Sequence, residues 1–502
     1  MPCDPGPAGG AEAAPGKGPA AATALAVAFC ATLAGCALTA PGPAAAPALP
    51  AAWQAPLPAA GAHGADAAAL AQWWARFDDP LLVRLVDAAQ RGNGDLAQAA
   101  ARIEQARATL RAAGSGSWPE FDGSARADRA RTEVGPLPGT VLATSSRTGV
   151  DALWEIDLFG VTRNTVRAAQ ARSEGAQLAW HDLRVSLAAE VAATYVSLRA
   201  CEALVDVYAQ DAQSQQRTAE LTLTKARAGL ESAANGALAR ASAADASTRL
   251  IGQQAECEVI VNTLSVLTTL PQTELRPQLA ARSRQLPQPA QFQVSAVPAQ
   301  WLAQRPDLAA LEREVLAAAG EVGAARADRY PSISLGGSIA LANARAGGVS
   351  ASGINWTVGP TLSVPLFDAG RRAAQVDAAQ ARYAEARARY EQRVRAAAAE
   401  VEQALLRLDA ATRREADART AAEGFGQYFA AQQALFAVGV GSLLDLEQAR
   451  RNALLAAAGL VNLQRERVAA WITLYKSLGG GWSATPPALA AAPSTPHPTP
   501  RK

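Results

Sequence analysis

This chain is poor in cysteine and histidine, the residues most often used as thiol nucleophiles, neutral-pH acid–base groups and transition-metal ligands. The 502 residues include five cysteines and three histidines. A catalytic or metal-binding histidine needs a carboxylate, thiol or second imidazole at a suitable spacing, and His63, His181 and His497 have no such neighbour. Gly347-Gly348 lacks the Gly-Lys-Ser/Thr of a phosphate-binding loop. The sequence therefore argues against an enzyme, and we expect no cofactor.

One cysteine closes an apolar leader. The run from Ala20 to Leu33, roughly 14 residues, has the length of a signal-peptide core and is too short to span a bilayer as a helix. It ends in Leu-Ala-Gly-Cys at Cys36, which resembles the lipobox of bacterial lipoproteins, where cleavage leaves the cysteine to carry lipid. The alternative is a chance match in an alanine-rich leader. Because Ala37 rather than aspartate follows, we expect delivery to the outer membrane of a Gram-negative bacterium.

Two further cysteines, Cys201 and Cys257, remain in the exported part of the chain. Disulfides persist outside the cytoplasm, so we expect a bond between them. Gly229 lies midway, 28 residues from each, and residues equally far from the turn of an antiparallel hairpin lie at the same height. The alternative is two buried free thiols.

The chain contains nearly the same unit twice, about 210 residues apart. Residues 229–240 read GLESAANGALAR and residues 439–450 read GVGSLLDLEQAR, with Gly, Ser, Ala and Arg at the same offsets. AAQAR likewise occurs at both 168–172 and 378–382. A repeat this long indicates a duplicated structural unit rather than a solenoid.

Hydrophobic periodicity and chain breakers predict the same order in each unit: helix, strand pair, long helical hairpin. The first long helix of each hairpin would measure roughly 100 Å. We predict a signal peptide (1–35), an extended N-terminal segment (36–78), a helix (79–117), a transmembrane strand pair (118–159), a periplasmic hairpin (160–270), a linker (271–298), a second helix (299–330), a second strand pair (331–367), a second hairpin (368–478) and a disordered tail (479–502).

The second strand of each pair alternates apolar and polar residues over about 10 positions. Such alternation with an interfacial aromatic residue is typical of a transmembrane β-strand, although an ordinary sheet would be favoured for one strand alone. Because the pattern recurs in both units after an export signal, we predict six lipid-facing residues: Trp154, Ile156, Trp356, Val358, Leu362 and Val364. Four strands cannot close a barrel in lipid, so we expect a barrel shared between subunits and coiled-coil packing of the helices in the periplasm.

These features together resemble the TolC family of outer-membrane efflux proteins, in the lipoprotein branch that includes OprM and NodT. The resembling segments follow the family's order over nearly the whole mature chain: the lipobox, WWARFDDPLLVRLV from Trp73, LWEIDLFG from Leu153, QRPDL from Gln304, SVPLFDAGRR from Ser363 and VGVGSLLDLEQAR from Val438.

The resemblance implies a mainly α-helical protein with transmembrane β-strands. It would form a homotrimer with a shared twelve-stranded barrel, four strands from each protomer, and a long periplasmic α-helical coiled-coil tunnel. It would serve as the passive exit duct of a tripartite pump for drugs or other small molecules. Its partners would be a periplasmic adaptor protein, an inner-membrane pump of RND type and outer-membrane lipid.

The resemblance also assigns roles at the hairpin ends. Residues that would contact the adaptor are Gly229, Ser232, Gly439, Gly441 and Ser442. Residues that would line or approach the pore constriction are Asn235, Asp445, Glu447 and Gln448. Many relatives carry aspartate where this chain has Gln448. The sequence therefore does not decide whether acidic side chains form a ring at the constriction. The alternative for these residues is the solvated start of an exposed helix.

Other functions stay open beside the efflux duct. The lipobox favours efflux over type I protein secretion, and scarce histidine and methionine give no sign of a metal route, although a duct need not bind its cargo. A periplasmic coiled-coil scaffold lipoprotein without a pore is the non-channel alternative. A net charge of +2 without a basic stripe argues against a nucleic-acid partner.

Overall fold

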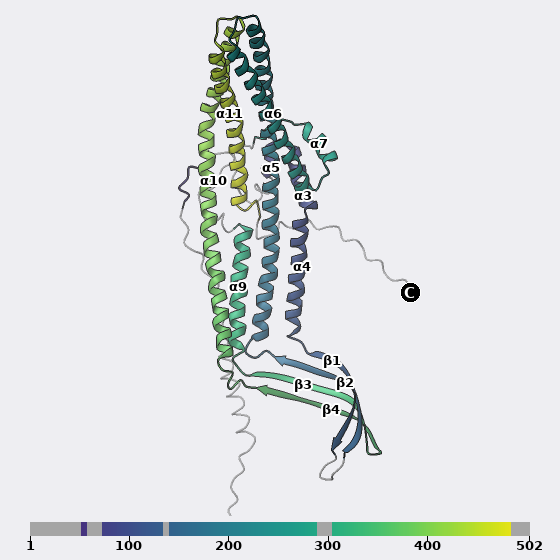
Figure 1. Ribbon diagram of the computed structural model, residues 1–502. Coiled ribbons are helices and arrows are strands. Elements are labelled where there is room, and N and C mark those ends of the chain that lie inside the picture. Colours follow the sequence, from purple (N-terminus) through teal and green to yellow (C-terminus); the bar gives the residue numbers. More distant parts are fainter. Residues whose placement is uncertain (1–51, 58–72, 134–139, 289–303, 483–502) are drawn as a thin grey trace, which may run out of the picture. The chain divides into compact units, whose positions relative to one another are not determined.

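The computed structural model describes residues 52–57, 73–133, 140–288 and 304–482, so Cys36 and the leader lie outside the described residues. One order of elements occurs twice (Figure 1). The first copy comprises α4 (Gly94–Ser115), β1 (Glu120–Glu133), β2 (Thr140–Ile156), α5 (Val161–Arg227) and α6 (Ala233–Thr268). The second comprises α9 (Pro306–Ala327), β3 (Ser332–Ala346), β4 (Val349–Ser363), α10 (Arg371–Ala437) and α11 (Leu443–Ser477). Three short elements complete the chain: η1 (Trp73–Phe77), α3 (Pro80–Gly92) and α7 (Gln272–Ala280).

The described residues form two compact units. One contains the four strands, which form a single antiparallel sheet in the order β1-β2-β3-β4, with the adjoining ends of the helices. The other contains the two hairpins, α5–α6 and α10–α11, with η1, α3 and α7. None of the helices among the described residues has an apolar stretch long enough to cross a bilayer.

The core of the helical unit includes an aromatic cluster that the sequence interpretation missed. Residues 36–78 were expected to be extended, but Trp73–Phe77 forms the 3-10 helix η1. Trp73 stacks on Tyr475 with ring centroids 5.6 Å apart, and Trp74 meets the same ring edge-on at 4.7 Å. Burying large rings contributes strongly to stability, so these contacts explain why the segment before α3 is ordered.

The helix predicted over 79–117 is two helices, because Asn93 interrupts it. Asn93 has an extended backbone, with φ −66° and ψ 127°, and its N–H donates to the carbonyl of Ala89 at 2.9 Å. Its side-chain oxygen accepts from the backbone N–H of Asp95 at 2.8 Å. Asn93 therefore ends α3 and caps α4, a role that asparagine fills well.

The linker and the tail are also more ordered than predicted. The linker assigned to 271–298 contains α7, whose Leu275 and Leu279 are buried, and Arg199 of α5 donates to the carbonyl of Leu279 at 2.9 Å. The tail was expected to begin at Gly479, but the hydroxyl of Tyr475 donates to the carbonyl of Gly480 at 2.9 Å. The rest of the predicted tail, 483–502, lies outside the described residues.

Candidate functional site

The register of the sheet places unlike residues on its two faces. Paired residues of antiparallel strands point to the same face. On one face, five successive rungs across β2, β3 and β4 are almost entirely apolar. We call these residues the apolar belt: Ile156–Ile333–Leu362, Trp154–Leu335–Pro360, Ala152–Gly337–Val358, Val150–Ile339–Trp356 and Thr148–Leu341–Ile354. Phe121, Gly123 and Ala125 of β1 continue three of these rungs.

Five of the six residues predicted to face lipid lie in this belt: Trp154, Ile156, Trp356, Val358 and Leu362. The exposed fraction of these residues runs from 36% for Trp154 to 73% for Trp356. Val364, in contrast, follows the last residue of β4 and is not part of the ladder. Each belt strand contributes residues over about 27 Å at the rise of a β-strand, close to the height of a transmembrane apolar band once the strand is tilted.

The belt residues of β1 and β3 were not recognised from the sequence. In β3, the glycine pair Gly336-Gly337 interrupts the apolar alternation of Ile333, Leu335, Ile339 and Leu341. The strand register restores it, because all four apolar residues pair with belt positions on β2 and β4.

The opposite face of the sheet is mostly polar or small, with Leu153 of β2 as a large apolar exception. Asp122 pairs with Asp151 and continues to Ser338 and Thr357 on β3 and β4. The hydroxyl of Ser124 donates to Asp151 at 3.0 Å. A sheet with one apolar face and one hydrated, partly acidic face fits a wall between lipid and water.

Both outer strands of the sheet have an unpaired side. Among the residues that the structure describes, β1 pairs only with β2, and β4 pairs only with β3. Each edge therefore presents a row of unpaired N–H and C=O groups, which favour pairing with another strand. Pro360 on β4 lacks one donor, and proline is tolerated at such edge positions.

The two hairpin ends have the same local geometry. Gly229 and Gly439 have φ of +74° and +84°, a left-handed conformation that favours glycine and commonly ends a helix. Ser232 then caps α6 by accepting from the backbone N–H of Asn235 at 3.0 Å. Ser442 caps α11 in the same way by accepting from the N–H of Asp445 at 3.1 Å. The sequence repeat is thus a repeat of helix stop, tight turn and cap.

The four candidate constriction residues differ in exposure. Asp445 and Gln448 are exposed, whereas Asn235 and Glu447 are half-buried. The amide of Asn235 donates to Glu231 at 2.8 Å and holds the pKa of that carboxyl below its usual value. The carboxylate of Glu447 interacts with neighbouring side chains of the same chain. Of Asp445 and Glu447, only Asp445 therefore presents an exposed carboxylate. Among the described residues, no group of three or more metal-ligating side chains could hold a metal ion.

Glu447 belongs to a buried ion pair that links the two hairpins. It forms a salt bridge with Arg450, whose side chain is only 3% exposed. Gln215 of α5 donates to Glu447 at 2.9 Å, and Arg450 donates to Thr218 of α5 at 2.7 Å. The Arg450 guanidinium also lies over the ring of Phe429 on α10, 5.3 Å from its centroid. Sequence reasoning missed this cluster, which fixes the start of α11 against α5 and α10.

A second ion pair, in which Asp211 is buried and Arg249 is exposed, extends this network along α5. Arg249 of α6 donates to Asp211 of α5 at 3.1 Å. Burial raises the pKa of Asp211, while the neighbouring Arg249 partly offsets the rise. Polar side chains from α5, α6 and α11 surround a cavity of about 110 Å³ here. The buried side chains of Asp211 and Arg450 therefore belong to one polar cluster where α5, α6 and α11 meet.

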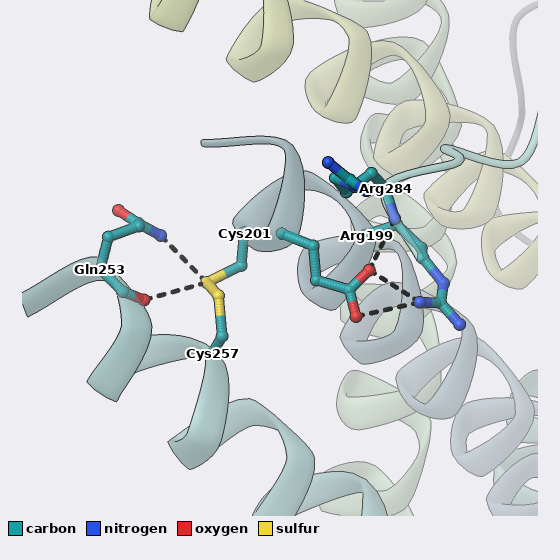
Figure 2. Close-up of a disulfide and its surroundings, with 6 residues drawn as sticks. Arg199, Cys201, Gln253, Cys257 and Arg284 are labelled. Atoms are coloured by element: carbon teal, nitrogen blue, oxygen red, sulfur yellow. Dashed lines mark hydrogen bonds and ion pairs between the residues drawn. A yellow bond between two sulfur atoms is a disulfide. The ribbon is translucent and has the colours of Figure 1, made fainter. Parts of the chain in front are cut away.

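Cys201 of α5 and Cys257 of α6 form a disulfide, with their Cα atoms 5.7 Å apart. Figure 2 shows Gln253 beside the bond, and its side-chain amide donates to the sulfur of Cys201 at 2.9 Å. Cys257 is buried and Cys201 nearly fully so. The bond closes a segment of 56 residues that contains the whole end of the hairpin.

Comparisons with known proteins agree on one family. The sequence profile described as "Outer membrane efflux protein" matches residues 85–269 and 297–480. The chain is 29% identical to the solvent efflux pump outer membrane protein SrpC of Pseudomonas putida, over 86% of this chain and 93% of that protein. It is 30% identical to the outer membrane protein OprJ of Pseudomonas aeruginosa, over 82% and 86%. The solved outer-membrane channel OprN superimposes with a TM-score of 0.79 at 28% identity, covering 89% of this chain and 99% of that one.

Proposed function

Because the chain belongs to the outer membrane efflux protein family, we propose that it forms the outer-membrane exit duct of a tripartite efflux pump. The duct would be a homotrimer that passes small molecules from the periplasm to the exterior. A periplasmic adaptor and an inner-membrane pump, of RND type in our proposal, would supply selection and energy. The chain itself would do no chemistry.

The two-faced sheet with unpaired edges is the observation that supports this function most. A four-stranded sheet in lipid must satisfy its edge groups, and only a closed barrel does so. If β1 of one protomer pairs with β4 of the next, three copies close a ring of twelve strands. The apolar belt would then face lipid, and the face that carries Asp122 and Asp151 would line the lumen.

The hairpin ends supply the periplasmic mouth in this proposal. The turns at Gly229 and Gly439 would contact the adaptor. We assign the exposed Asp445 and Gln448 to the constriction, where side chains brought together around an axis set the width and field of a pore. Asn235 and Glu447 would support the constriction from within the protomer.

The proposed cargo is a small organic molecule. Relatives are named for solvent, toluene and antibiotic efflux, and another, 29% identical, is the cation efflux system protein CusC. The described residues contain no metal-binding group, and this favours organic cargo only weakly, because a duct need not hold what it passes.

Conductance of the purified protein in planar bilayers tests the channel, with two neighbouring residues of β4 as matched variants. Val358→Arg adds a charge to the centre of the apolar belt, which costs about 2–4 kcal/mol for each subunit in lipid. We expect heat-modifiable trimers to fall several-fold. Thr357→Arg adds the same charge to the opposite face, so we expect trimers to persist and cation conductance to fall. A wild-type protein that stays water-soluble without detergent and does not conduct would contradict the proposal, and equal assembly of the two variants would contradict the assigned faces.

The lipid anchor is a separate proposal, resting on the motif that ends at Cys36. The chain after this cysteine is attached to α10, because the backbone N–H groups of Gln54 and Ala55 donate to the two carboxylate oxygens of Glu402 at 2.7 and 2.9 Å. The strands, not the lipid, would hold the protein in the membrane, since a lipid alone is a modest anchor.

We therefore expect Cys36→Ser to reduce delivery to the outer membrane while purified protein still conducts. Mass spectrometry of the mature N-terminus should find cleavage after Gly35 and a lipid on Cys36. Ala37→Ser serves as the control and should keep both the lipid and the delivery. An unmodified N-terminus at another residue of wild-type protein would contradict the lipid anchor.

A further inference from the structure

The apolar belt ends abruptly toward the loops that join β1 to β2 and β3 to β4. The next two rungs of the same face are polar. The first contains Ser146, Asn343 and Ser352, and the second contains Arg129, Thr144, Arg345 and Ser350. We call these seven residues the polar rungs. The change from apolar to polar occurs at the same height on β2, β3 and β4, and one rung later on β1, where Ala127 pairs with Ser146.

The polar rungs surround a hollow rather than a flat surface. A pocket of about 320 Å³ is lined by six residues of the polar rungs, Thr144, Ser146, Asn343, Arg345, Ser350 and Ser352, together with Ala344 and Ala351. The amide of Asn343 donates to the hydroxyl of Ser146 at 3.5 Å, which holds the two polar groups on adjacent strands together. Hydroxyl, amide and guanidinium groups thus converge on one volume.

The arginines of this face have no ion-pair partner among the described residues. Arg129 and Arg345 are exposed, as is Arg131 one rung further on. On the opposite face, by contrast, Arg126 pairs with Asp128 at 2.7 Å and Arg147 with Asp151 at 3.5 Å. Among the described strands, Glu133 is the only acidic residue at a register position on the same face as the polar rungs. It pairs with Thr140, at the last residue pair of β1 and β2.

We propose that the polar rungs bind phosphate groups of the lipid headgroups in the outer leaflet of the outer membrane. This rests on the proposed function, in which the belt faces lipid and the hairpins lie in the periplasm. The loops that join β1 to β2 and β3 to β4 are at the strand ends away from the helices, so they would face the exterior. The polar rungs begin where the apolar belt ends, which is the depth at which headgroups replace hydrocarbon. Guanidinium groups are the preferred partners of phosphate because they donate paired hydrogen bonds in a matching geometry, and the serine and threonine hydroxyls suit the sugars of a phosphorylated glycolipid.

The position of the site favours a lipid over a soluble anion as its ligand. A soluble anion would compete poorly with lipid here, because the belt directly below is flanked by lipid chains whose headgroups are at very high local concentration. A lipid also accounts for the charge difference between the two faces, since among the described strand residues only the face continuous with the belt carries arginines without an ion pair.

Native mass spectrometry of the purified trimer with added lipid A tests the site. The double variant Arg129→Gln/Arg345→Gln should bind bisphosphorylated lipid A at least about tenfold more weakly than wild type. The control Arg126→Gln/Arg147→Gln removes the same charge from the opposite face and should bind as wild type does. Dephosphorylated lipid A should bind wild type no better than the double variant, and inorganic phosphate should not displace the lipid.

The outcomes separate this inference from the proposed function. Conductance of the double variant should equal that of wild type, because the polar rungs lie outside the lumen. Full lipid binding by the double variant, or an equal loss in the control, would overturn the lipid site and leave the channel standing. Displacement by inorganic phosphate would show a site for free anions instead. If the double variant does not assemble, Arg345→Gln and Arg345→Lys decide, since only the lysine variant should keep part of the binding.

Discussion

Removing the bond between Cys201 and Cys257 is expected to destabilise the helical unit by about 2–4 kcal/mol. The bond closes a segment of 56 residues, and closing a loop of that size restricts the unfolded chain by up to about 4 kcal/mol. We expect the melting temperature to fall by roughly 3 to 10 °C. The cost falls on the hairpin α5–α6, since the bond ties its two helices far from the turn.

Thermal unfolding with and without reductant measures this effect. Wild type should lose stability on reduction, and Cys201→Ser/Cys257→Ser should already be destabilised and insensitive to reductant. The double variant is the control that separates the bond from other effects of the reductant. Peptide mapping under non-reducing conditions should find the two cysteine peptides linked. Two alkylatable thiols in oxidatively folded protein would contradict the bond.

The parts of the fold that could be predicted are those fixed by local chemistry. The helix stops at Gly229 and Gly439 and the caps at Ser232 and Ser442 follow from residues within one turn of the chain. The two strand pairs were predictable because β2 and β4 alternate clearly. Local sequence patterns do not give the pairing register between strands. That register is needed to identify the belt residues of β1 and β3.

Two of the errors, at α7 and η1, share a tertiary cause. α7 was not predicted because it lies in a proline-rich stretch. A nine-residue helix is stabilised by the burial of Leu275 and Leu279 rather than by the helix propensity of its residues. η1 was missed for the same reason, since its tryptophans contact Tyr475, which is 402 and 401 residues away from them in the chain. The break at Asn93 is a different error, because its flanking glycines were visible in the sequence.

Arg240 and Arg450 show most clearly what could not be predicted from the sequence. They hold the same position in the repeated motif, yet Arg240 is exposed and Arg450 is 3% exposed. The difference comes from the neighbours: Arg450 meets Glu447, Thr218 and the ring of Phe429. The repeat therefore predicts the backbone of the second hairpin end but not its charged core.

The different burial of Arg240 and Arg450 allows a matched test of which contacts stabilise the end of the second hairpin. Glu447→Leu removes the carboxylate and leaves the buried Arg450 without its partner, which costs about 3–5 kcal/mol in comparable buried pairs. The cost is local to the start of α11, because Thr218 and Gln215 tie this pair to α5. We expect the end of the second hairpin to loosen and, if it forms the constriction as proposed, the resting conductance in planar bilayers to rise several-fold.

Two controls decide whether the unpaired charge is the cause. Arg240→Leu changes the equivalent but exposed arginine and should leave both stability and conductance as in wild type. Glu447→Leu/Arg450→Leu removes both charges, and apolar replacements of a buried pair are often neutral, so the double variant should recover most of the lost stability. A rise in conductance that persists unchanged in the double variant would show that the contacts to α5, not the buried charge, hold the end closed. Wild-type conductance in Glu447→Leu would show that this ion pair does not restrain the pore.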